Sequence, residues 1–245
     1  MITIMLPAFN EAGSIGNLLD SFIRAFEEEK RRWRIILVDD GSSDGTGDIA
    51  RSYQGTIDIE VVAHSVNRGL AEALKTGLIR AVETAADDEI IITMDSDGSH
   101  LPGLVFRMVR LVKEGHDVVI ASRYRAGSRI RGVSLFRRLM SRGAAILCKL
   151  TFPIRGVRDY TCGYRAYKAF LLKRVFTDYG QEIISEPGFS CMVDLLLKVN
   201  RYEPIITEVP FILRYDLKAG PSKMNVKLTV KQTLMLLLRR RLGLK

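Results

Sequence analysis

The chain has 245 residues, 47% of them hydrophobic, which is enough to bury a sizeable core in one large α/β domain or two small ones. The formal net charge of +9 predicts an anionic partner: a nucleic acid, a phosphate-bearing ligand or an acidic membrane surface. The three cysteines are scattered and form no CxxC pair, which argues against a disulfide framework and a zinc site. The start of the chain lacks a signal-peptide pattern, which argues against secretion. No apolar run reaches about 18 residues, so we expect no membrane-spanning helix.

The first half of the chain alternates short apolar runs with helical patterns. We expect strands over residues 2–6, 34–38, 57–63, 89–94 and 117–121. Helices are predicted between them, over residues 12–30, 69–86 and 101–114, with one more after the loop that follows the second strand. Strands that are apolar throughout and are separated by helices predict a mostly parallel sheet covered on both faces. In such a sheet, ligands bind at the carboxyl ends of the strands.

The second half is less regular. A basic loop at 123–132 precedes a helix at 134–150, and "RDYTCGYRAYK" is a turn that leads into a short strand. We expect a helix at 187–200, one or two strands within 205–213 and a last helix at 226–241. This pattern divides the chain into a domain at residues 1–225 and a basic amphipathic C-terminal helix at 226–245.

The stretch "ITMDSDGSH" ends a predicted core strand on two carboxylates, Asp95 and Asp97. Like charges this close repel, and each group would hold its proton unless a cation lies between them. Oxygen ligands suit Mg²⁺ or Mn²⁺, which keep water ligands and bind substrate phosphates. The alternative is a polar turn that closes the strand. His100 lies beside the pair, whereas we expect no metal or general-base role for His64 or His116.

Two other strand ends carry candidate ligand-binding residues. In "VDDGSSDGT", Asp40 can accept hydrogen bonds from a ribose or a base edge, while Asp44 or Thr46 is available to cap the next helix. In "PAFNE", Phe9 offers a ring to a base, and Glu11 either contacts a ligand or favours the helix N-terminus. Neither segment has the glycine pattern of a dinucleotide fold or of a phosphate-cradling loop.

Basic residues are concentrated in two segments that contain no acid. The first holds seven arginines, at positions 123, 125, 129, 131, 137, 138 and 142, and the second holds seven Lys or Arg between 223 and 245. Arg123, Arg137 and Arg142 can converge on phosphates through bidentate contacts, the alternative being a solvated basic face. The final helix joins "LMLLL" to "RRR". It either packs on the domain or lies on an anionic membrane with its arginines at head-group level.

Together these motifs resemble the family 2 glycosyltransferases of GT-A fold, and the branch to which they are most similar is dolichol-phosphate (polyprenol-phosphate) mannosyltransferase. The resemblance covers nearly the whole chain and rests on the order and spacing of "PAFNE", "DDGSSDGT", "NRGLAEALKTG", "MDSDGSHLP", "ASRY", "FRRLMSRGA", "DYTCGYRAYK", "EPGF" and "EVPFILR" followed by "GPSK". It implies an α/β GT-A catalytic domain over residues 1–225 with a Rossmann-like nucleotide-binding half.

The resemblance also implies a role for each matching residue. The nucleotide sugar would contact Pro7, Phe9, Glu11, Val38, Asp40, Asp95, Ser96, Asp97, Arg123 and Arg214. The acceptor phosphate would contact Arg137, Arg142 and Lys223, and the catalytic residues would be Asp95, Asp97 and Arg123. The metal ligands would be Asp95, Asp97 and Ser99, where Ser99 replaces the glutamine common in the family. Phe9 stands where the family usually has a tyrosine, so a hydroxyl contact is lost.

The implied reaction moves a hexose to a dolichyl or polyprenyl monophosphate with inversion of the anomeric carbon. The hexose that the resemblance favours is mannose, with GDP-mannose as the donor. Mg²⁺ or Mn²⁺ would neutralise the leaving diphosphate. A lipid phosphate has a second pKa near roughly 6, so it needs no strong general base. The implied partners are the nucleotide sugar, the lipid phosphate and an anionic membrane surface or a membrane protein, at the inner, cytoplasmic face, with no nucleic acid.

Several alternatives stay open from the sequence. The donor can be a UDP-sugar, and the acceptor a protein, a glycan or diacylglycerol. A nucleotide-sugar nucleotidyltransferase would need a basic residue in the loop after the first strand, and "PAFNEAGSIG" has none. The net charge of +9 alone also fits a nucleic-acid-binding protein, against which the paired acids argue. A catalytically inactive member of the same fold would not need both aspartates.

Overall fold

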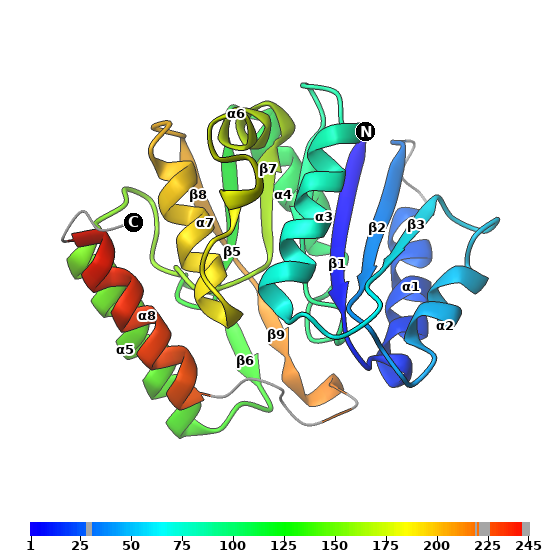
Figure 1. The fold of residues 1–245 in the computed structure, drawn as a ribbon, viewed down its shortest axis with the longest axis horizontal. Coiled ribbons are helices and arrows are strands. Elements are labelled where there is room, and N and C mark those ends of the chain that lie inside the picture. The colour runs from blue at the N-terminus through cyan, green and yellow to red at the C-terminus, as the bar shows by residue number, and fades with distance from the viewer. Residues whose placement is uncertain (28–30, 219, 221–225, 242–245) are drawn as a thin grey trace.

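A seven-stranded sheet forms the centre of the molecule, in the order β3-β2-β1-β4-β7-β5-β8 (Figure 1). The computed structural model describes residues 1–27, 31–218, 220 and 226–241. The strands of this sheet are β1 (Ile2–Ala8), β2 (Trp33–Asp39), β3 (Ile59–Ala63), β4 (Ile90–Thr93), β5 (Val118–Ser122), β7 (Arg165–Lys168) and β8 (Ile206–Pro210). Within it β7 pairs antiparallel with β4 and β5, and the other pairings are parallel. The predicted mostly parallel α/β sheet is thus confirmed.

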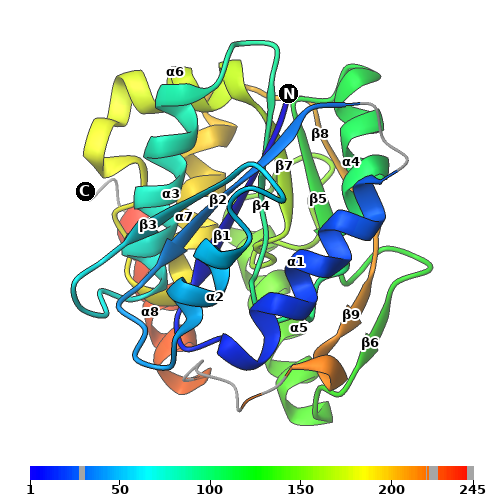
Figure 2. The same ribbon diagram turned by 90° about the vertical axis from the view of Figure 1, so that its right-hand side faces the viewer.

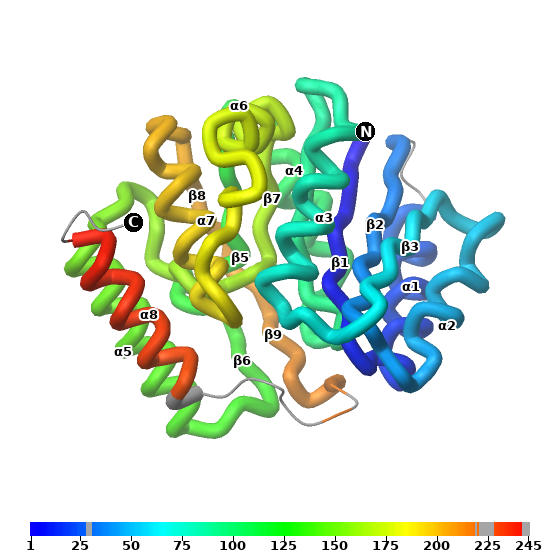
Figure 3. Tube along the Cα trace, viewed as in Figure 1, coloured from blue at the N-terminus to red at the C-terminus, as the bar shows by residue number. Residues whose placement is uncertain are grey.

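Helices cover both faces of this sheet. They are α1 (Ala12–Phe26), α2 (Thr46–Ser52), α3 (Leu70–Thr84), α4 (Leu104–Lys113), α5 (Leu135–Thr151), α6 (Ala169–Tyr179), α7 (Cys191–Asn200) and α8 (Val226–Arg241), with short 3₁₀ turns η1 (Gly180–Ile183), η2 (Gly188–Ser190) and η3 (Tyr215–Leu217). Figure 2 shows α3 and α7 on one side of the sheet and α1 and α4 on the other. The tube in Figure 3 shows α5 and α8 side by side beyond α7.

The apolar runs of the sequence become the central strands because both of their faces are buried. Every residue of β4 and β5 is buried. On α1 the residues that face the sheet recur at helical spacing and include Ile15, Leu19 and Phe22, each 0% exposed. Burying one such side chain stabilises the fold by about 1.5–3 kcal/mol relative to leaving it in water. This core fixes the strand ends on which the polar residues lie.

Several predicted boundaries differ from the structure. The basic loop at 123–132 contains a strand, β6 (Arg129–Arg131), which pairs in parallel with β9 (Ile212–Arg214) as a separate two-stranded sheet. A helix, α6, lies where none was predicted, although Leu171, Leu172 and Val175 recur at helical spacing. The region 205–213, predicted as one or two strands, contributes to two, β8 and β9. The predicted end of the first helix, residues 28–30, lies outside the described residues.

The two loops that follow β1 and β2 are tied together by Asp44 and Thr46. The Asp44 carboxylate accepts hydrogen bonds from the backbone N–H of Ala12 at 2.9 Å and of Thr46 at 3.0 Å, so it serves the first turns of both α1 and α2. The Thr46 hydroxyl accepts from the N–H of Glu11 at 2.8 Å. The N-cap residue of α2 is Gly45, not Asp44 or Thr46 as expected, but Asp44 still accepts the first N–H of that helix. Asp44 and Thr46 also accept N–H groups at the start of α1, which lack partners within their own helix.

We expect Gly41→Ala to lower the free energy of unfolding by about 2 kcal/mol or more. Gly41 has φ +71°, and an added Cβ would lie 2.4 Å from the carbonyl carbon of Val66. Gly45 has φ +88° with nothing within 4 Å of such a Cβ, so Gly45→Ala is the matched control and should cost no more than about 1 kcal/mol. Urea unfolding of the two variants measures the difference, and equal losses would contradict the steric argument.

Candidate functional site

The ends of β1, β2 and β4 meet at one edge of the sheet because these strands are parallel neighbours. The Ser96 hydroxyl donates a hydrogen bond to the carbonyl of Pro7 at 2.7 Å, which joins the acidic loop to the end of β1. The Ser14 hydroxyl donates to the Glu11 carboxylate at 2.8 Å. The structure therefore brings Pro7, Glu11 and Ser96 together, as the sequence predicts.

Asp97 is the more enclosed of the two acids that follow β4. Its side chain is 10% exposed, and its carboxylate accepts hydrogen bonds from the Ser99 N–H at 3.0 Å and from the Lys218 ammonium at 2.7 Å. The Asp95 side chain is 39% exposed, and one of its oxygens lies 3.8 Å from Nε2 of His100. The two acids thus have different surroundings: Asp97 is enclosed and paired with a cation, and Asp95 is only partly buried.

The two carboxyl groups are shifted in opposite directions. Burial raises the pKa of Asp95, because the protein around it withholds water, and repulsion from Asp97 adds to this rise while His100 and Lys218 oppose it. Burial also acts to raise the pKa of Asp97, but the Lys218 ammonium outweighs it and lowers that pKa. Asp97 is therefore the carboxylate that stays ionised most readily.

His100 is positioned to orient Asp95. It is 4% exposed and stacks on the ring of Tyr164, with the ring centroids 5.1 Å apart. Its Nδ1 accepts a hydrogen bond from the Asp95 N–H at 3.3 Å. This contact puts the imidazole proton on Nε2, the nitrogen that faces the Asp95 carboxylate.

Lys218 reaches Asp97 because the chain crosses over the acidic loop after β9. The Arg214 N–H donates to the carbonyl of Ser99 at 2.9 Å, and the Arg214 guanidinium pairs with Asp216 at 2.9 Å. The ring of Tyr215 lies between two cations: the Arg137 guanidinium is 5.4 Å and the Lys218 ammonium 5.6 Å from its centroid. Residues 214–218, which we call the crossing segment, thus bring α5 and the acid pair into one site.

Arg123 is held by a buried acid. Its guanidinium donates to both oxygens of Asp159, at 2.8 and 2.6 Å, and to the Thr161 hydroxyl at 2.6 Å. Asp159 is 0% exposed and also accepts the N–H of Arg123 at 3.0 Å. Burial acts to lower the pKa of Arg123, but the charge of Asp159 and its hydrogen bonds act together in the opposite direction, and the pKa is raised. The predicted phosphate-binding arginine is thus engaged by the chain itself.

Asp40 also has partners within the chain. Its carboxylate accepts hydrogen bonds from Nδ1 of His64 at 2.7 Å and from the N–H groups of Arg68 at 2.9 Å and Gly69 at 2.8 Å. Asp40 is 2% exposed, so it anchors the loop that leads into α3. His64, for which no ligand role was expected, is the side-chain partner of Asp40.

The other predicted site residues are more dispersed. Val38 is fully buried, and its side chain faces Gly77 of α3, away from the strand-end edge. Ser99 is 2% exposed, while Arg142 is exposed on α5. Phe9 is half-buried and directly follows β1. Lys223 lies outside the described residues.

The acid pair suits a hard divalent cation. It offers carboxylate oxygens from Asp95 and Asp97, and their mutual repulsion is relieved when a cation binds. Among the residues that the structure describes, no group of three or more His, Cys, Asp and Glu side chains is arranged to hold a metal ion. A cation there would therefore complete its coordination with water or substrate oxygens, and it would compete with Lys218 for Asp97.

The sequence model of the family described as Glycosyl transferase family 2 matches residues 3–176, which include the acid pair, Arg123 and Asp159. The chain belongs to glycosyltransferase family 2. Its fold is the GT-A glycosyltransferase fold, and the predictions of family and fold are confirmed.

Two curated relatives of this family 2 glycosyltransferase match most of the chain. Dolichol-phosphate mannosyltransferase of Pyrococcus furiosus is 26% identical over 92% of the chain, and the chain spans 60% of that relative's length. Undecaprenyl-phosphate mannosyltransferase of Micrococcus luteus is 29% identical over 91% of the chain and 87% of the relative. A similar solved structure is that of glucosyl-3-phosphoglycerate synthase of Mycobacterium tuberculosis in complex with Mn²⁺, UDP-glucose and phosphoglyceric acid. The superposition includes 100% of this chain and 80% of the synthase chain, with 23% sequence identity and a TM-score of 0.69.

Lys218, Asp159 and Tyr215 are site residues of this glycosyltransferase that the sequence analysis did not name as ligand-binding. Lys218 pairs with an acid 121 positions away, which no local pattern reveals. The signal that could have found it is a lysine in the polar segment "YDLKAGPSK", directly after the last strand. Asp159 is the acid of "DYTCGY", and only the fold shows that it is buried against Arg123.

We expect Lys218→Gln to bind Mn²⁺ about fivefold more tightly than the wild type in the absence of nucleotide, because the variant loses a competing ion pair of about 1 kcal/mol. Titration of free Mn²⁺ by electron paramagnetic resonance measures the dissociation constant. Lys173→Gln is the control, since Lys173 pairs with the exposed Asp87 at 2.7 Å elsewhere. Unchanged or weaker Mn²⁺ binding by Lys218→Gln would contradict the competition.

We expect Arg123→Met to lower the free energy of unfolding at neutral pH by about 3 kcal/mol, because it leaves the Asp159 carboxylate buried without its cation. Arg125→Met, at an exposed position, should change it by less than about 0.5 kcal/mol. Urea unfolding of both variants gives the comparison. Equal stability of the two variants would show that the ion pair does not stabilise the fold.

The same pair predicts a pH dependence. Burial acts to raise the pKa of Asp159, but Arg123 outweighs it and lowers that pKa. A carboxyl group with a folded pKa below its unfolded value of about 3.9 stabilises the fold above that pH, and this contribution is lost as the pH falls through the folded pKa. The difference in the free energy of unfolding between Arg123→Met and Arg125→Met should therefore be largest at neutral pH and should shrink as the pH falls and Asp159 becomes protonated, which urea unfolding at several pH values measures.

Proposed function

We propose that this family 2 glycosyltransferase transfers a hexose from a nucleoside diphosphate sugar to a polyprenyl phosphate, with inversion of the anomeric carbon and with Mg²⁺ or Mn²⁺. The observation that carries the proposal is the carboxylate pair Asp95 and Asp97 at the end of β4, with Lys218 paired to Asp97 and Arg137 on the Tyr215 ring that Lys218 also contacts. Carboxylates beside cations suit the binding of a diphosphate with its counter-ion. The names of the Pyrococcus and Micrococcus relatives support the polyprenyl phosphate acceptor.

For the donor, we propose GDP-mannose. Both curated relatives described above are named as mannosyltransferases and match the sequence of more than nine-tenths of the chain. The solved structure with UDP-glucose is 23% identical, which supports the shared fold and not the donor. UDP-glucose is the second candidate, because that neighbour places a UDP-sugar on the same fold.

The positions of the site residues support a proposed role for each of them in binding the donor. Asp95 and Asp97 would hold the metal ion, which when bound offsets negative charge on the leaving diphosphate. Phe9 and Glu11, at the end of β1, are proposed to contact the nucleoside. Lys218 is proposed to move from Asp97 to a phosphate oxygen when donor and metal bind, because the metal ion would replace the ammonium as the partner of that carboxylate.

The acceptor phosphate is proposed to bind beside α5, where Arg137 contacts Tyr215 and Arg142 is exposed. The predicted third contact, Lys223, lies outside the described residues. The donor diphosphate and the acceptor phosphate repel each other in water. A cationic surface that binds both would hold the acceptor phosphate oxygen near the anomeric carbon, on the side opposite the leaving group. The new bond joins that oxygen to the sugar as the bond to the nucleoside diphosphate breaks. The dianionic phosphate supplies the electron pair, so no strong general base is required.

A membrane surface is the proposed partner, and α5 and α8 are the proposed contact. These two helices carry ten exposed large apolar side chains: Leu135, Phe136, Leu139, Ile146, Leu147, Leu150, Leu228, Leu234, Met235 and Leu238. Their sequences contain Arg and Lys but no acid, which favours an anionic lipid surface over a second copy of the same basic face. No helix in the described part of the chain is long and apolar enough to cross a bilayer.

The last helix is also fixed to the domain. Leu236 and Leu237 are buried, and the Arg240 guanidinium pairs at 2.8 Å with Asp194, which is 0% exposed and also binds Lys198. Of the two alternatives for this helix, packing on the domain is therefore observed. The proposed membrane contact uses its other, exposed face together with α5.

We expect wild-type protein with Mg²⁺ or Mn²⁺ to label polyprenyl phosphate from radioactive GDP-mannose, and Asp97→Asn to lose at least about 100-fold of this activity. Asp88→Asn, an exposed acid at the other end of β4, is the matched control and should keep full activity. Labelling that persists in a chelator would contradict the metal dependence. Donor hydrolysis without lipid labelling would contradict the proposed acceptor.

We expect Leu139→Glu with Ile146→Glu to weaken flotation with anionic vesicles about tenfold or more, because two exposed side chains of α5 can no longer enter the lipid. Both positions are more than half exposed, so the fold should tolerate the change. Phe170→Glu, at an exposed position on α6, is the control. Flotation equal to that of the control would contradict the membrane contact.

A further inference from the structure

A basic hollow lies between the loop after β5 and the end of α5, beside the Arg123–Asp159 pair and apart from the acid pair. Its volume is about 520 Å³. It is lined by Arg125, Lys149, Pro153, Ile154, Arg155, Gly156, Val157 and Arg158. Four of these eight residues are cationic and none is acidic, so the hollow concentrates positive charge with no compensating carboxylate in its wall.

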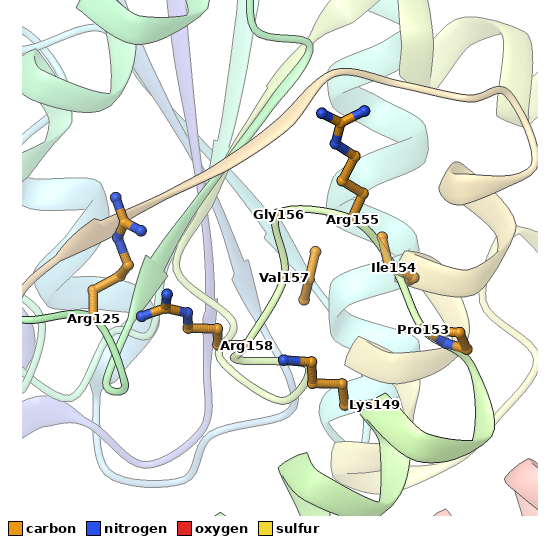
Figure 4. A pocket seen from close by; sticks show the side chains of 8 residues that line it. All are labelled: Arg125, Lys149, Pro153, Ile154, Arg155, Gly156, Val157 and Arg158. Carbon is orange, nitrogen blue, oxygen red and sulfur yellow. The ribbon is translucent and has the colours of Figure 1, made fainter.

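The cations are arranged around one space. Figure 4 shows the Arg158 side chain extending toward Arg125 and the Lys149 side chain extending toward Arg158. Arg155 projects from the other end of the short loop 155–158 that carries Arg158. In the described part of the chain, none of the four side chains has a hydrogen bond or an ion pair. Cations gathered in this way repel one another until an anion binds among them.

The loop that carries these cations is held in one conformation. Gly156 has φ +84°, and its Cα lies so close to β8 that an added Cβ would be 2.4 Å from the carbonyl oxygen of Ile206. The N–H of Arg158 donates to the Glu208 carboxylate at 2.6 Å. The side chains of Ile154 and Val157 are buried, at 6% and 2% exposed. The basic side chains therefore project from a fixed backbone, which lowers the entropy cost of binding.

The hollow is separate from the acid pair. Lys149 follows Arg137 by 12 positions on α5, which corresponds to about 18 Å along the helix axis. The hollow is lined neither by the strand-end residues Pro7, Glu11, Asp95, Ser96 and Asp97 nor by the crossing segment. An anion bound here would thus be a different molecule, or a different part of an assembly, from the reacting donor and acceptor.

We propose that this hollow is a second anion site that binds the phosphate group of a small phosphorylated compound or of a phospholipid headgroup. Arginine forks and a lysine ammonium bind phosphate oxygens by charge-assisted hydrogen bonds. The volume lies within the roughly 300–1,000 Å³ typical of small-molecule sites, and the exposed side chain of Pro153 suits the carbon part of such a ligand. The proposal goes beyond the transfer reaction and does not require it.

The test uses the full chain and two probes: glycerol 3-phosphate in solution, and vesicles of phosphatidylglycerol compared with phosphatidylcholine. Arg155→Ala with Arg158→Ala removes two cations of the hollow at exposed side chains and leaves α5 unchanged. Arg107→Ala with Lys113→Ala removes two cations from exposed positions on α4, so it matches the loss of net charge. Calorimetry at constant ionic strength measures the soluble probe, and flotation measures the vesicles.

We expect the hollow variant to bind one of the probes at least about tenfold more weakly than the wild type, while the α4 variant binds like the wild type. A loss confined to glycerol 3-phosphate would identify a soluble phosphorylated ligand, and a loss confined to phosphatidylglycerol vesicles would identify a lipid headgroup. Equal binding by the two variants with both probes would overturn the proposal and leave only a solvated basic face. The comparison is independent of sugar transfer, so an incorrect donor or acceptor would not affect it.

Discussion

Two carboxylates at the end of a buried strand require a positive neighbour, and the arrangement of the strand-end site follows from this requirement. The repulsion between Asp95 and Asp97 is offset by Lys218, whose ammonium lies 2.7 Å from Asp97. To supply that ammonium, the chain crosses the acidic loop after β9, and this crossing segment also brings Tyr215 against Arg137 of α5. A single electrostatic constraint therefore joins the strand-end edge of the sheet to α5.

Other acids near the site have partners within the chain. Asp40 binds the N–H groups that begin the loop into α3, Asp44 serves two helix starts, and Asp159 fixes Arg123 with both of its oxygens. Preorganisation of this kind suits a transfer reaction between two anions, in which positioning contributes more than proton transfer. Asp95 and Asp97 differ from these acids because their nearest cation, Lys218, is a flexible side chain that a metal ion can replace.

The sequence predicted the parallel sheet and the strand-end edge because apolar runs and helical spacing are local signals, and these placed Asp95, Asp97 and Glu11 correctly at that edge. The β6–β9 pair was missed because "RIR" is too short and too charged to read as a strand. Lys218 and Asp159 were missed because an ion pair between distant segments has no local pattern. Whether Arg123 contacts a phosphate or an acid of the chain is likewise decided only by the fold, which places Asp159 against it.

The central claim is that the acid pair is a cation site which Lys218 neutralises until a metal ion and a diphosphate arrive. The most direct measurement is a crystal structure of the protein with Mn²⁺ and a nucleoside diphosphate, using the anomalous signal of manganese. We expect an anomalous manganese peak at the carboxylates of Asp95 and Asp97, with the Lys218 ammonium moved away from Asp97. A bound diphosphate with the Lys218–Asp97 pair intact and no manganese at these carboxylates would contradict it.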